Sequence, residues 1–419
     1  MSQSQKKSIG QVSAITISQL ILKAGEVYLA SIENGEEVPS ILLLGKPGVG
    51  KTVGLRNLAK VLADVLDKEF VDLKREWWRY DEVMSSPEKC FAFLDFSVTH
   101  VEPTDLSGFP RTDGKDYVSY LPLEYVKLFS NPKAYGMLFL DEITLDNRVD
   151  RKSAEYKILD EHQFGFRTLS PTVMLVAAGN TDKDISLAEP LPDPILRGRV
   201  MRFYIRPPTV DEWIAFMNEE YGDKWDNRVA VFLKRWPDLL WVQYQDDAGY
   251  DPRASPRNWT KLAVLLYCMD NSGNNEKIDK LKSAVSEMFG GIEVSNDTII
   301  DALISGSEAQ LFKDFIATQV PSLDELRVNA SMWKQLSLEA KYLITSMLSQ
   351  KSIDELSERY VEILYVMAEA DREFVELLKN LLPREKRIQF ATRMARRHPR
   401  VFKALSDSRR SAVDFGLEG

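Results

Sequence analysis

The stretch ILLLGKPGVGKT occupies residues 41–52. Its first four residues are an unbroken apolar run between Pro39 and Gly45, which predicts a strand buried on both faces. The eight residues that follow fit G-x-x-x-x-G-K-[ST], the pattern of a loop whose backbone N–H groups surround phosphates. Leucine and valine residues recur at three- and four-residue spacing from Leu55 to Val65 and predict a helix. Strand, glycine loop and helix therefore follow one another directly, as a phosphate-binding loop requires.

Each residue of this loop has an expected chemical task. Gly48 and Gly50 let the backbone curl so that successive N–H groups face inward, and the start of the next helix adds its positive dipole end. Lys51 is expected to reach the β- and γ-phosphates, and Thr52 to offer its hydroxyl to Mg²⁺. The predicted nucleotide-binding residues are Pro47, Gly48, Val49, Gly50, Lys51, Thr52 and Val53.

Four further apolar runs continue the pattern along the first half of the chain. They are FAFLDF at 91–96, MLFL at 137–140, VMLVAA at 173–178 and the more mixed VMRFYI at 200–205. Helical periodicity appears at 18–33 and around 149–162. Strands that alternate with helices predict a parallel sheet covered on both faces.

Polar side chains follow two of these runs. Asp141 and Glu142 come directly after 137–140, at the carboxyl edge of the predicted sheet, where ligands bind in such folds. Asp141 is expected to orient the hydration shell of Mg²⁺, and Glu142 to polarise the attacking water. Asn180 follows the run 173–178 and is expected to position that water between Glu142 and the γ-phosphate.

Arginine residues in two segments are candidates for contacts with phosphate. ILRGRVMRF at 195–203 presents Arg197 and Arg199 just before the last predicted strand. An arginine supplied to a neighbouring subunit stabilises transition-state charge on a γ-phosphate, and we favour Arg199 over Arg197 for this role. SPRNW at 255–259 places Arg257 in the first turn of a helix, where a cation opposes the dipole and an external anion would offset this.

Strand patterns largely stop after Pro208, and helical patterns take over. Capping-box patterns begin helices after Ser322 and after Ser352. The fold class predicted is α/β, a P-loop NTPase sheet followed by an α-helical lid and an all-α C-terminal region. The predicted domains are a nucleotide-binding domain at 1–207, a lid at 208–320 and a helical domain at 321–419.

Composition narrows the classes of function. The chain has 419 residues, a net charge of −9 and 28% charged residues, so it is a globular protein and a poor non-specific ligand for nucleic acid. Two distant cysteines and three scattered histidines exclude a disulfide framework and a zinc cluster. No apolar run approaches the roughly 20 residues that span a bilayer, and the N-terminus does not read as a secretory signal. We therefore expect a cytoplasmic protein.

Taken in order, these motifs resemble those of an AAA+ ATPase, most closely its MoxR-like, dynein-related branch. GKPGVGKT resembles the GxPGxGKT of that branch, and EPTDLSG at 102–108 resembles its insertion after the second strand. LPDPILRGR at 191–199 is similar to its arginine-finger segment, and ASPR at 254–257 to its sensor 2. One departure is ITLDNRVD at 143–150, where the branch often has Asn-Arg-Ala-Pro. The resemblance covers roughly residues 10–320.

The resemblance implies Mg²⁺-dependent ATP hydrolysis in a ring, usually a hexamer, with ATP at subunit interfaces. It also implies remodelling or maturation of a protein complex, often with a von Willebrand factor A-domain partner. A second hypothesis is a nucleic-acid-dependent motor or a restriction-type translocase. A third is a nucleotide-gated scaffold with negligible turnover, which an intact Glu142 and Arg199 speak against.

The sequence of two segments allows more than one interpretation. Residues 384–410 contain ten basic and two acidic residues, which fits a surface for nucleic acid, a solvated helix face or a contact with an acidic protein. Residues 66–90 contain Trp77 and Trp78. They form either an insertion that contacts a partner or another subunit, or a segment whose tryptophans pack on the sheet.

Overall fold

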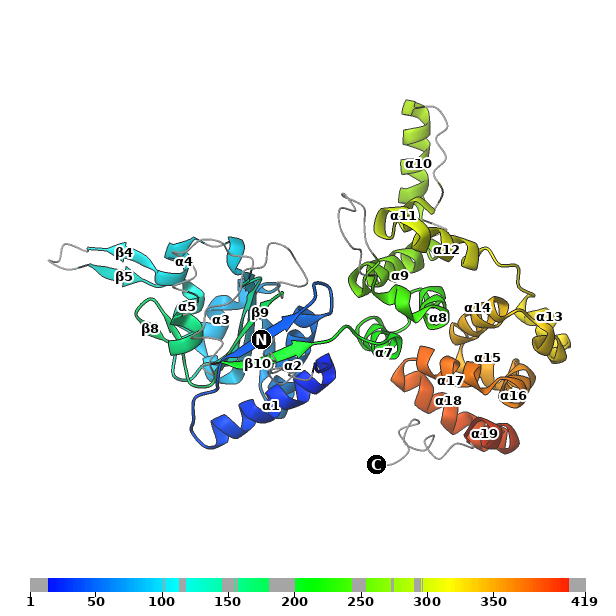
Figure 1. Cartoon of the computed structure of the whole chain (residues 1–419), viewed down its shortest axis with the longest axis horizontal. Coiled ribbons are helices and arrows are strands. Elements are labelled where there is room, and N and C mark those ends of the chain that lie inside the picture. Colours follow the sequence, from blue (N-terminus) through cyan, green and yellow to red (C-terminus); the bar gives the residue numbers. More distant parts are fainter. Residues whose placement is uncertain are drawn as a thin grey trace, which may run out of the picture. The chain divides into compact units, whose positions relative to one another are not determined.

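The computed structural model describes residues 14–100, 102–112, 118–144, 155, 157–180, 200–242, 254–272, 275–289, 295 and 297–406. The chain divides into two compact units, Met1–Pro207 and Pro208–Gly419. In Figure 1 the first unit runs from α1 to β10 and the second from α7 to α19. The division falls where the sequence places the end of the nucleotide-binding domain. Within the described ranges, no helix combines the length and the apolar character needed to cross a membrane.

A parallel sheet forms the centre of the first unit. Its described strands lie in the order β10-β1-β9-β6-β3-β2, and each neighbouring pair is parallel. The strands are β1 (Ile41–Gly45), β2 (Glu69–Asp72), β3 (Cys90–Ser97), β6 (Tyr135–Asp141), β9 (Val173–Gly179) and β10 (Met201–Ile205). All except β2 correspond to the apolar runs of the sequence. The short β2 lies at the edge of the sheet, and its first residue is exposed.

Alternate residues of β1 serve the cores on the two faces of the sheet. Ile41 and Leu43 face one core with α1 (Ile17–Glu33) and α2 (Lys51–Val65), whereas Leu42 and Leu44 face the other. The second core also receives side chains from three short helices. These are α3 (Tyr80–Ser85), α4 (Pro103–Ser107) and α5 (Glu124–Phe129). The sheet is thus covered on both faces, as predicted.

Two small antiparallel hairpins lie outside this sheet. The first pairs β4 (Phe109–Arg111) with β5 (Ser119–Leu121), and the second pairs β7 (Gln163–Phe164) with β8 (Arg167–Thr168). Figure 1 shows the β4–β5 hairpin extending away from the sheet. The sequence did not predict either hairpin, because strands of two or three residues are too short to show an alternating pattern.

The described elements of the second unit are helices, and all of them except α10 contribute side chains to one core. They are α7 (Val210–Tyr221), α8 (Asn227–Arg235), α9 (Pro256–Asp270), α10 (Glu276–Phe289), α11 (Asp297–Leu303), α12 (Gly306–Ile316), α13 (Leu323–Val328), α14 (Leu338–Ser349), α15 (Ile353–Glu358), α16 (Val361–Ala370), α17 (Arg372–Leu381), α18 (Arg384–Arg397) and α19 (Pro399–Ser406), with short 3₁₀ turns between. The predicted capping boxes begin α13 and α15. One cluster of buried side chains extends from Val210 to Leu405. The predicted fold class, α/β with a parallel sheet followed by helices, is confirmed. A separate lid at 208–320 and a separate domain at 321–419 stay predictions.

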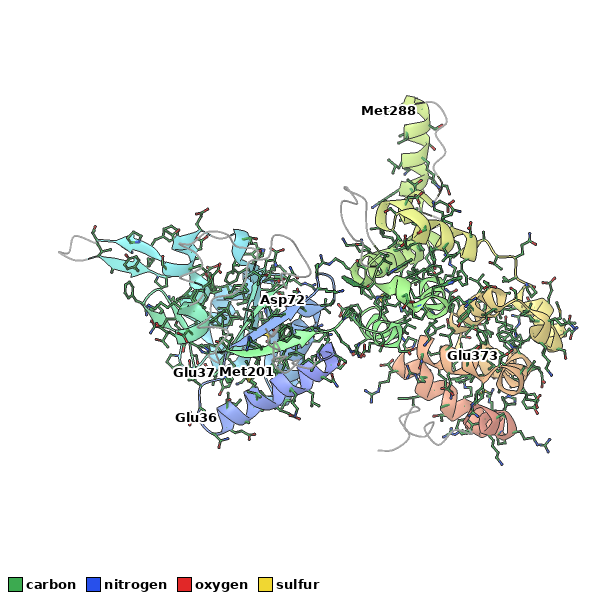
Figure 2. All side chains as sticks on the ribbon, in the orientation of Figure 1. Glu36, Glu37, Asp72, Met201, Met288 and Glu373 are labelled. Carbon is green, nitrogen blue, oxygen red and sulfur yellow. The ribbon has the colours of Figure 1, made fainter. Side chains whose placement is uncertain are left out.

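A buried cluster of charges ties α2 to two strands of the sheet. Arg56 Nε lies 2.8 Å from Asp72 Oδ2, and Arg56 Nη2 lies 3.0 Å from Asp95 Oδ2. Asp72, which is labelled in Figure 2, ends β2, and Asp95 lies near the end of β3. The side chains of Arg56, Asp72 and Asp95 are 12%, 4% and 5% exposed. The guanidinium therefore bridges two carboxylates that water reaches poorly, and the exposed Lys74 and Arg75 pair with Asp95 and Asp72 as well.

Replacing Arg56 with Met is expected to lower the free energy of unfolding of the first unit by about 3 kcal/mol, because two buried carboxylates lose their shared partner. Denaturant unfolding of the full chain measures this. The control is Lys23→Met, which removes the exposed ion pair of Lys23 with Glu26 and is expected to cost less than about 1 kcal/mol. Equal effects of the two substitutions would contradict this account of the cluster.

Candidate nucleotide site

The loop after β1 has the backbone geometry that the sequence predicts for a phosphate-binding loop. Gly48 and Gly50 adopt φ angles of 80° and 93°, in the left-handed region that glycine enters without steric cost. Gly50 is the N-cap of α2, and no side chain caps this helix. The start of α2, with its positive dipole end, thus faces the loop without a side-chain cap, and helix N-termini of this kind bind anions.

Lys51 connects this loop to the neighbouring strand. Its Nζ donates hydrogen bonds to the backbone oxygens of Gly45 and Lys46 and, at 3.2 Å, to Asn180 Oδ1. Asn180 follows β9 directly and is 8% exposed. The structure therefore brings together two predicted site residues that lie 129 positions apart in the chain.

Thr52 and Asp141 form a second contact between α2 and the sheet. Thr52 Oγ1 donates to Asp141 Oδ2 at 3.3 Å. Burial raises the pKa of Asp141, whereas the Glu142 N–H, the Lys51 charge and the Thr52 hydroxyl act in the opposite direction. A hydroxyl and a carboxylate side by side are the oxygen ligands that Mg²⁺ takes from a protein while it keeps waters and substrate phosphates. These two residues therefore fit a magnesium ion bound together with a nucleotide.

Glu142 occupies a strained backbone position at the end of β6. Its φ angle is 63°, in the left-handed region that a residue with a Cβ rarely adopts. Its N–H donates to Asp141 Oδ1 at 2.9 Å, which stabilises the turn. Such strain costs on the order of 1–3 kcal/mol and is found at functional sites. Because of this φ angle, the side chain of Glu142 leaves the backbone in a different direction from the side chains of the preceding β6 residues.

Two hydroxyls of β3 and the turn after it hold the Glu142 carboxylate. Ser97 Oγ donates to Glu142 Oε2 at 2.5 Å, and Thr99 Oγ1 donates to the same oxygen at 3.1 Å. Sequence reasoning missed both residues. The available signal was that Ser97 and Thr99 follow the apolar run 91–96, just as Glu142 follows 137–140. In the sheet, Ser97 lies opposite Asp141.

Thr144 positions Asn180. The Asn180 N–H donates to Thr144 Oγ1 at 2.8 Å, and Ile143 N–H donates to Ala178 O at 3.0 Å. Gly179 permits this packing, since a Cβ there would lie 2.4 Å from Thr144 Cγ2. Sequence reasoning did not single out Thr144, because only the pairing of β6 with β9 brings it to Asn180.

Of the three predicted site arginines, the structure describes Arg257. Arg197 and Arg199 lie outside the described residues. Arg257 is exposed and follows Pro256, the first residue of α9, in a turn that the Ser255 side chain caps. It belongs to the second unit. Its expected contact with a phosphate stays a prediction, as does the finger role of Arg199 or Arg197.

Comparison with known proteins shows only remote or very short likenesses. No family model matches the chain. A 36-residue segment is 58% identical to an uncharacterized protein, ycf45, of Porphyra purpurea, but it spans 9% of this chain and 6% of that protein.

Solved structures cover more of the chain at low similarity. C. elegans PCH-2 is 12% identical, with 72% of this chain and 68% of that chain covered and a TM-score of 0.29. The Aeropyrum pernix ORC1 protein in complex with DNA is 16% identical, with 90% and 86% covered and a TM-score of 0.33. The Thermotoga maritima RuvB Holliday junction branch migration motor is 17% identical, with 70% and 80% covered and a TM-score of 0.27. Likenesses at these TM-scores do not indicate a function, so we infer function from the site residues and from the motifs of the sequence.

Replacing Lys51 with Ala is expected to weaken ATP binding at least about a hundredfold, because it removes the ammonium that we expect to bind the phosphates. Calorimetric titration with ATP and Mg²⁺ measures the affinity. Lys60→Ala is the matched control, since Lys60 is an exposed lysine of the same helix, α2. Undiminished binding by the Lys51 variant would contradict the assignment of the loop.

Proposed function

We propose that this chain is an AAA+ ATPase of the MoxR-like kind, which hydrolyses ATP in the presence of Mg²⁺. The observation that carries the proposal is the meeting of Lys51, Thr52, Asp141, Glu142 and Asn180 at the carboxyl ends of β1, β6 and β9. No other arrangement in the described residues combines a phosphate-binding loop with adjacent carboxylates.

Each of these residues has a task in the proposed reaction. The loop N–H groups and Lys51 bind the β- and γ-phosphates, and Thr52 and Asp141 hold the metal ion. When bound, Mg²⁺ neutralises charge on the phosphate oxygens. Glu142 orients and polarises the attacking water as a general base. Asn180, held by Lys51 and Thr144, positions that water.

Two hydroxyls hold the Glu142 carboxylate in this structure. Its Oε2 accepts hydrogen bonds from both Ser97 and Thr99. We expect these two contacts to fix the direction of the Glu142 carboxylate relative to the attacking water.

We further propose that several copies assemble, as a hexameric ring, and act in the cytoplasm on a protein complex that they remodel or help to mature. A von Willebrand factor A-domain partner belongs to the same proposal. Arg199, or alternatively Arg197, would enter the site of the neighbouring copy and stabilise charge on the γ-phosphate. Arg257 would contact the nucleotide from the lid. These statements rest on the sequence resemblance.

The alternative of a nucleic-acid motor receives little support from the basic segment. In α18, Lys386 Nζ lies 2.8 Å from Asp223 Oδ2. Arg393 pairs with Asp354 and Arg397 with Glu358. These pairs join α18 to other parts of the second unit and neutralise three of its cations. They favour a structural role for this stretch over a surface for phosphates.

Replacing Glu142 with Gln is expected to reduce ATP hydrolysis by about 10²–10⁴-fold while ATP binding is retained, because only the base is removed. Release of phosphate measures the first quantity and calorimetry the second. Glu36→Gln, an exposed carboxylate far from the loop and labelled in Figure 2, is the control. Unchanged hydrolysis in the Glu142 variant would show that another group is the base.

Copies with Arg199→Ala and copies with Lys51→Ala are expected to be inactive separately and partly active when mixed. In a mixed assembly, an intact Arg199 can face an intact phosphate loop across the interface. ATPase activity is measured against mixing ratio, with native mass spectrometry to establish that mixed assemblies form. Absence of recovery at every ratio in mixed assemblies would exclude a finger in trans.

A further inference from the structure

The short turn after β6 is joined to the end of β9 by two hydrogen bonds. Ile143 N–H donates to Ala178 O at 3.0 Å. Asn180 N–H donates to Thr144 Oγ1 at 2.8 Å. Ile143 and Thr144 are 1% and 3% exposed, so both bonds are shielded from water. Because the turn begins at Glu142 and the second bond ends at Asn180, the two bonds join the proposed base to the proposed water-positioning amide.

Thr144 supplies an oxygen at the point where regular pairing of the two strands has ended. The parallel pairing of β6 with β9 ends with Leu140 opposite Ala177. Glu142, with its φ angle of 63°, then turns the chain out of the strand conformation. The N–H of Asn180 lies beyond the paired residues, and a side-chain oxygen accepts its hydrogen bond. A buried N–H without a partner is costly, so the Thr144 hydroxyl stabilises the Asn180 backbone at this edge of the sheet.

Gly179 allows Thr144 to come this close. A Cβ at residue 179 would lie 2.4 Å from Thr144 Cγ2 and 2.9 Å from Thr144 Oγ1. The φ angle of Gly179 is not in the left-handed region, so this position requires glycine for space and not for backbone conformation. The threonine and the glycine therefore form a matched pair of residues between the turn and β9.

ATP binding depends less on this pair than hydrolysis does. The Nζ of Lys51 donates to Asn180 Oδ1, but it also donates to the backbone oxygens of Gly45 and Lys46. A shift of Asn180 leaves both of these oxygens in place, and the phosphate-binding loop keeps its geometry. The same shift changes where the Asn180 amide lies relative to Glu142. Loss of the Thr144 oxygen is thus expected to affect the chemical step more than the affinity for ATP.

We propose that Thr144 is a positioning residue for ATP hydrolysis, which fixes the Asn180 amide relative to the Glu142 carboxylate and thereby sets kcat. This inference rests on the proposed function and adds a residue to the five that carry it. Thr144 acts through Asn180, and its hydroxyl oxygen is the atom responsible. A displacement of about 1 Å in an active site can slow a reaction about 10²-fold, which gives the scale of the expected effect.

The test compares variants of Thr144 in the release of phosphate from ATP, with kcat and KM determined separately. Thr144→Val keeps the branched shape and loses the hydroxyl. It is expected to lower kcat about 10–100-fold and to change KM less than about threefold. Thr144→Ser keeps the hydroxyl and is expected to retain at least about half of kcat.

A second pair of variants keeps the test decisive if the valine variant does not fold. Thr144→Ala and Thr144→Ser both lack the methyl group of threonine, and they differ only in the hydroxyl. The alanine variant is expected to have a kcat at least about tenfold below that of the serine variant. Thermal unfolding of each full-length variant establishes that it is folded.

The matched control is Thr172→Val, at the other end of the same two strands. Thr172 Oγ1 donates to Ala134 O at 2.6 Å, and these residues directly precede β9 and β6. β9 has seven residues, which at about 3.3 Å each separate the two ends by about 20 Å. The control thus removes the same chemical group from the same strand pair, and it is expected to change kcat less than about twofold.

Three outcomes would overturn the inference. The first is a kcat that neither Thr144→Val nor the change from serine to alanine alters by more than about twofold. The second is an equal loss of kcat in the Thr144→Val and Thr172→Val variants, which would indicate general damage to the sheet. The third is a loss confined to KM.

The unsubstituted chain separates this inference from the proposed function. If it binds and hydrolyses ATP and the Thr144→Val variant does so equally fast, the positioning role alone is refuted. If the unsubstituted chain binds ATP in calorimetry but releases no phosphate, the proposed hydrolysis is refuted. If it binds no ATP, the nucleotide site itself is refuted.

Discussion

The hydrogen bond between Lys51 and Asn180 is the contact on which the candidate site depends. It joins the first residue of α2 to the residue after β9, and the Thr52–Asp141 bond joins the same helix to the end of β6. β9 lies between β1 and β6 in the sheet, so parallel pairing brings three distant segments to one edge. The left-handed Gly48 and Gly50 form the turn that leads from β1 into α2 at this edge. Sheet order, loop geometry and polar contacts are thus parts of one arrangement.

The elements that carry this arrangement could be predicted because their signals are local. β1, β6 and β9 are buried on both faces or nearly so, and such strands appear as unbroken apolar runs. The loop pattern specifies its own backbone geometry through Gly48 and Gly50. β2 could not be predicted in this way, because EFVD is a four-residue edge strand with an exposed end. The β7–β8 hairpin has two residues in each strand and no periodicity to detect.

The residues that sequence reasoning missed depend on contacts between strands. Ser97 holds Glu142 because β3 and β6 pair with Ser97 opposite Asp141, and one sequence does not specify that register. Thr144 reaches Asn180 only because Gly179 leaves room for it. Trp77 and Trp78 show the opposite case. Large apolar side chains such as these are often buried, and only the structure shows that both are exposed. Local motifs therefore predict which side chains form the candidate site, and the pairing of distant strands decides how those side chains are oriented.

The central claim is that the loop between β1 and α2 binds the phosphates of ATP. Isothermal titration of the unsubstituted full chain with ATP, with and without Mg²⁺, tests it most directly. We expect saturable binding of one nucleotide per chain that is tighter with Mg²⁺, because Thr52 and Asp141 then contribute through the metal ion. An absence of binding at nucleotide concentrations found in cells, with a folded protein, would contradict the claim.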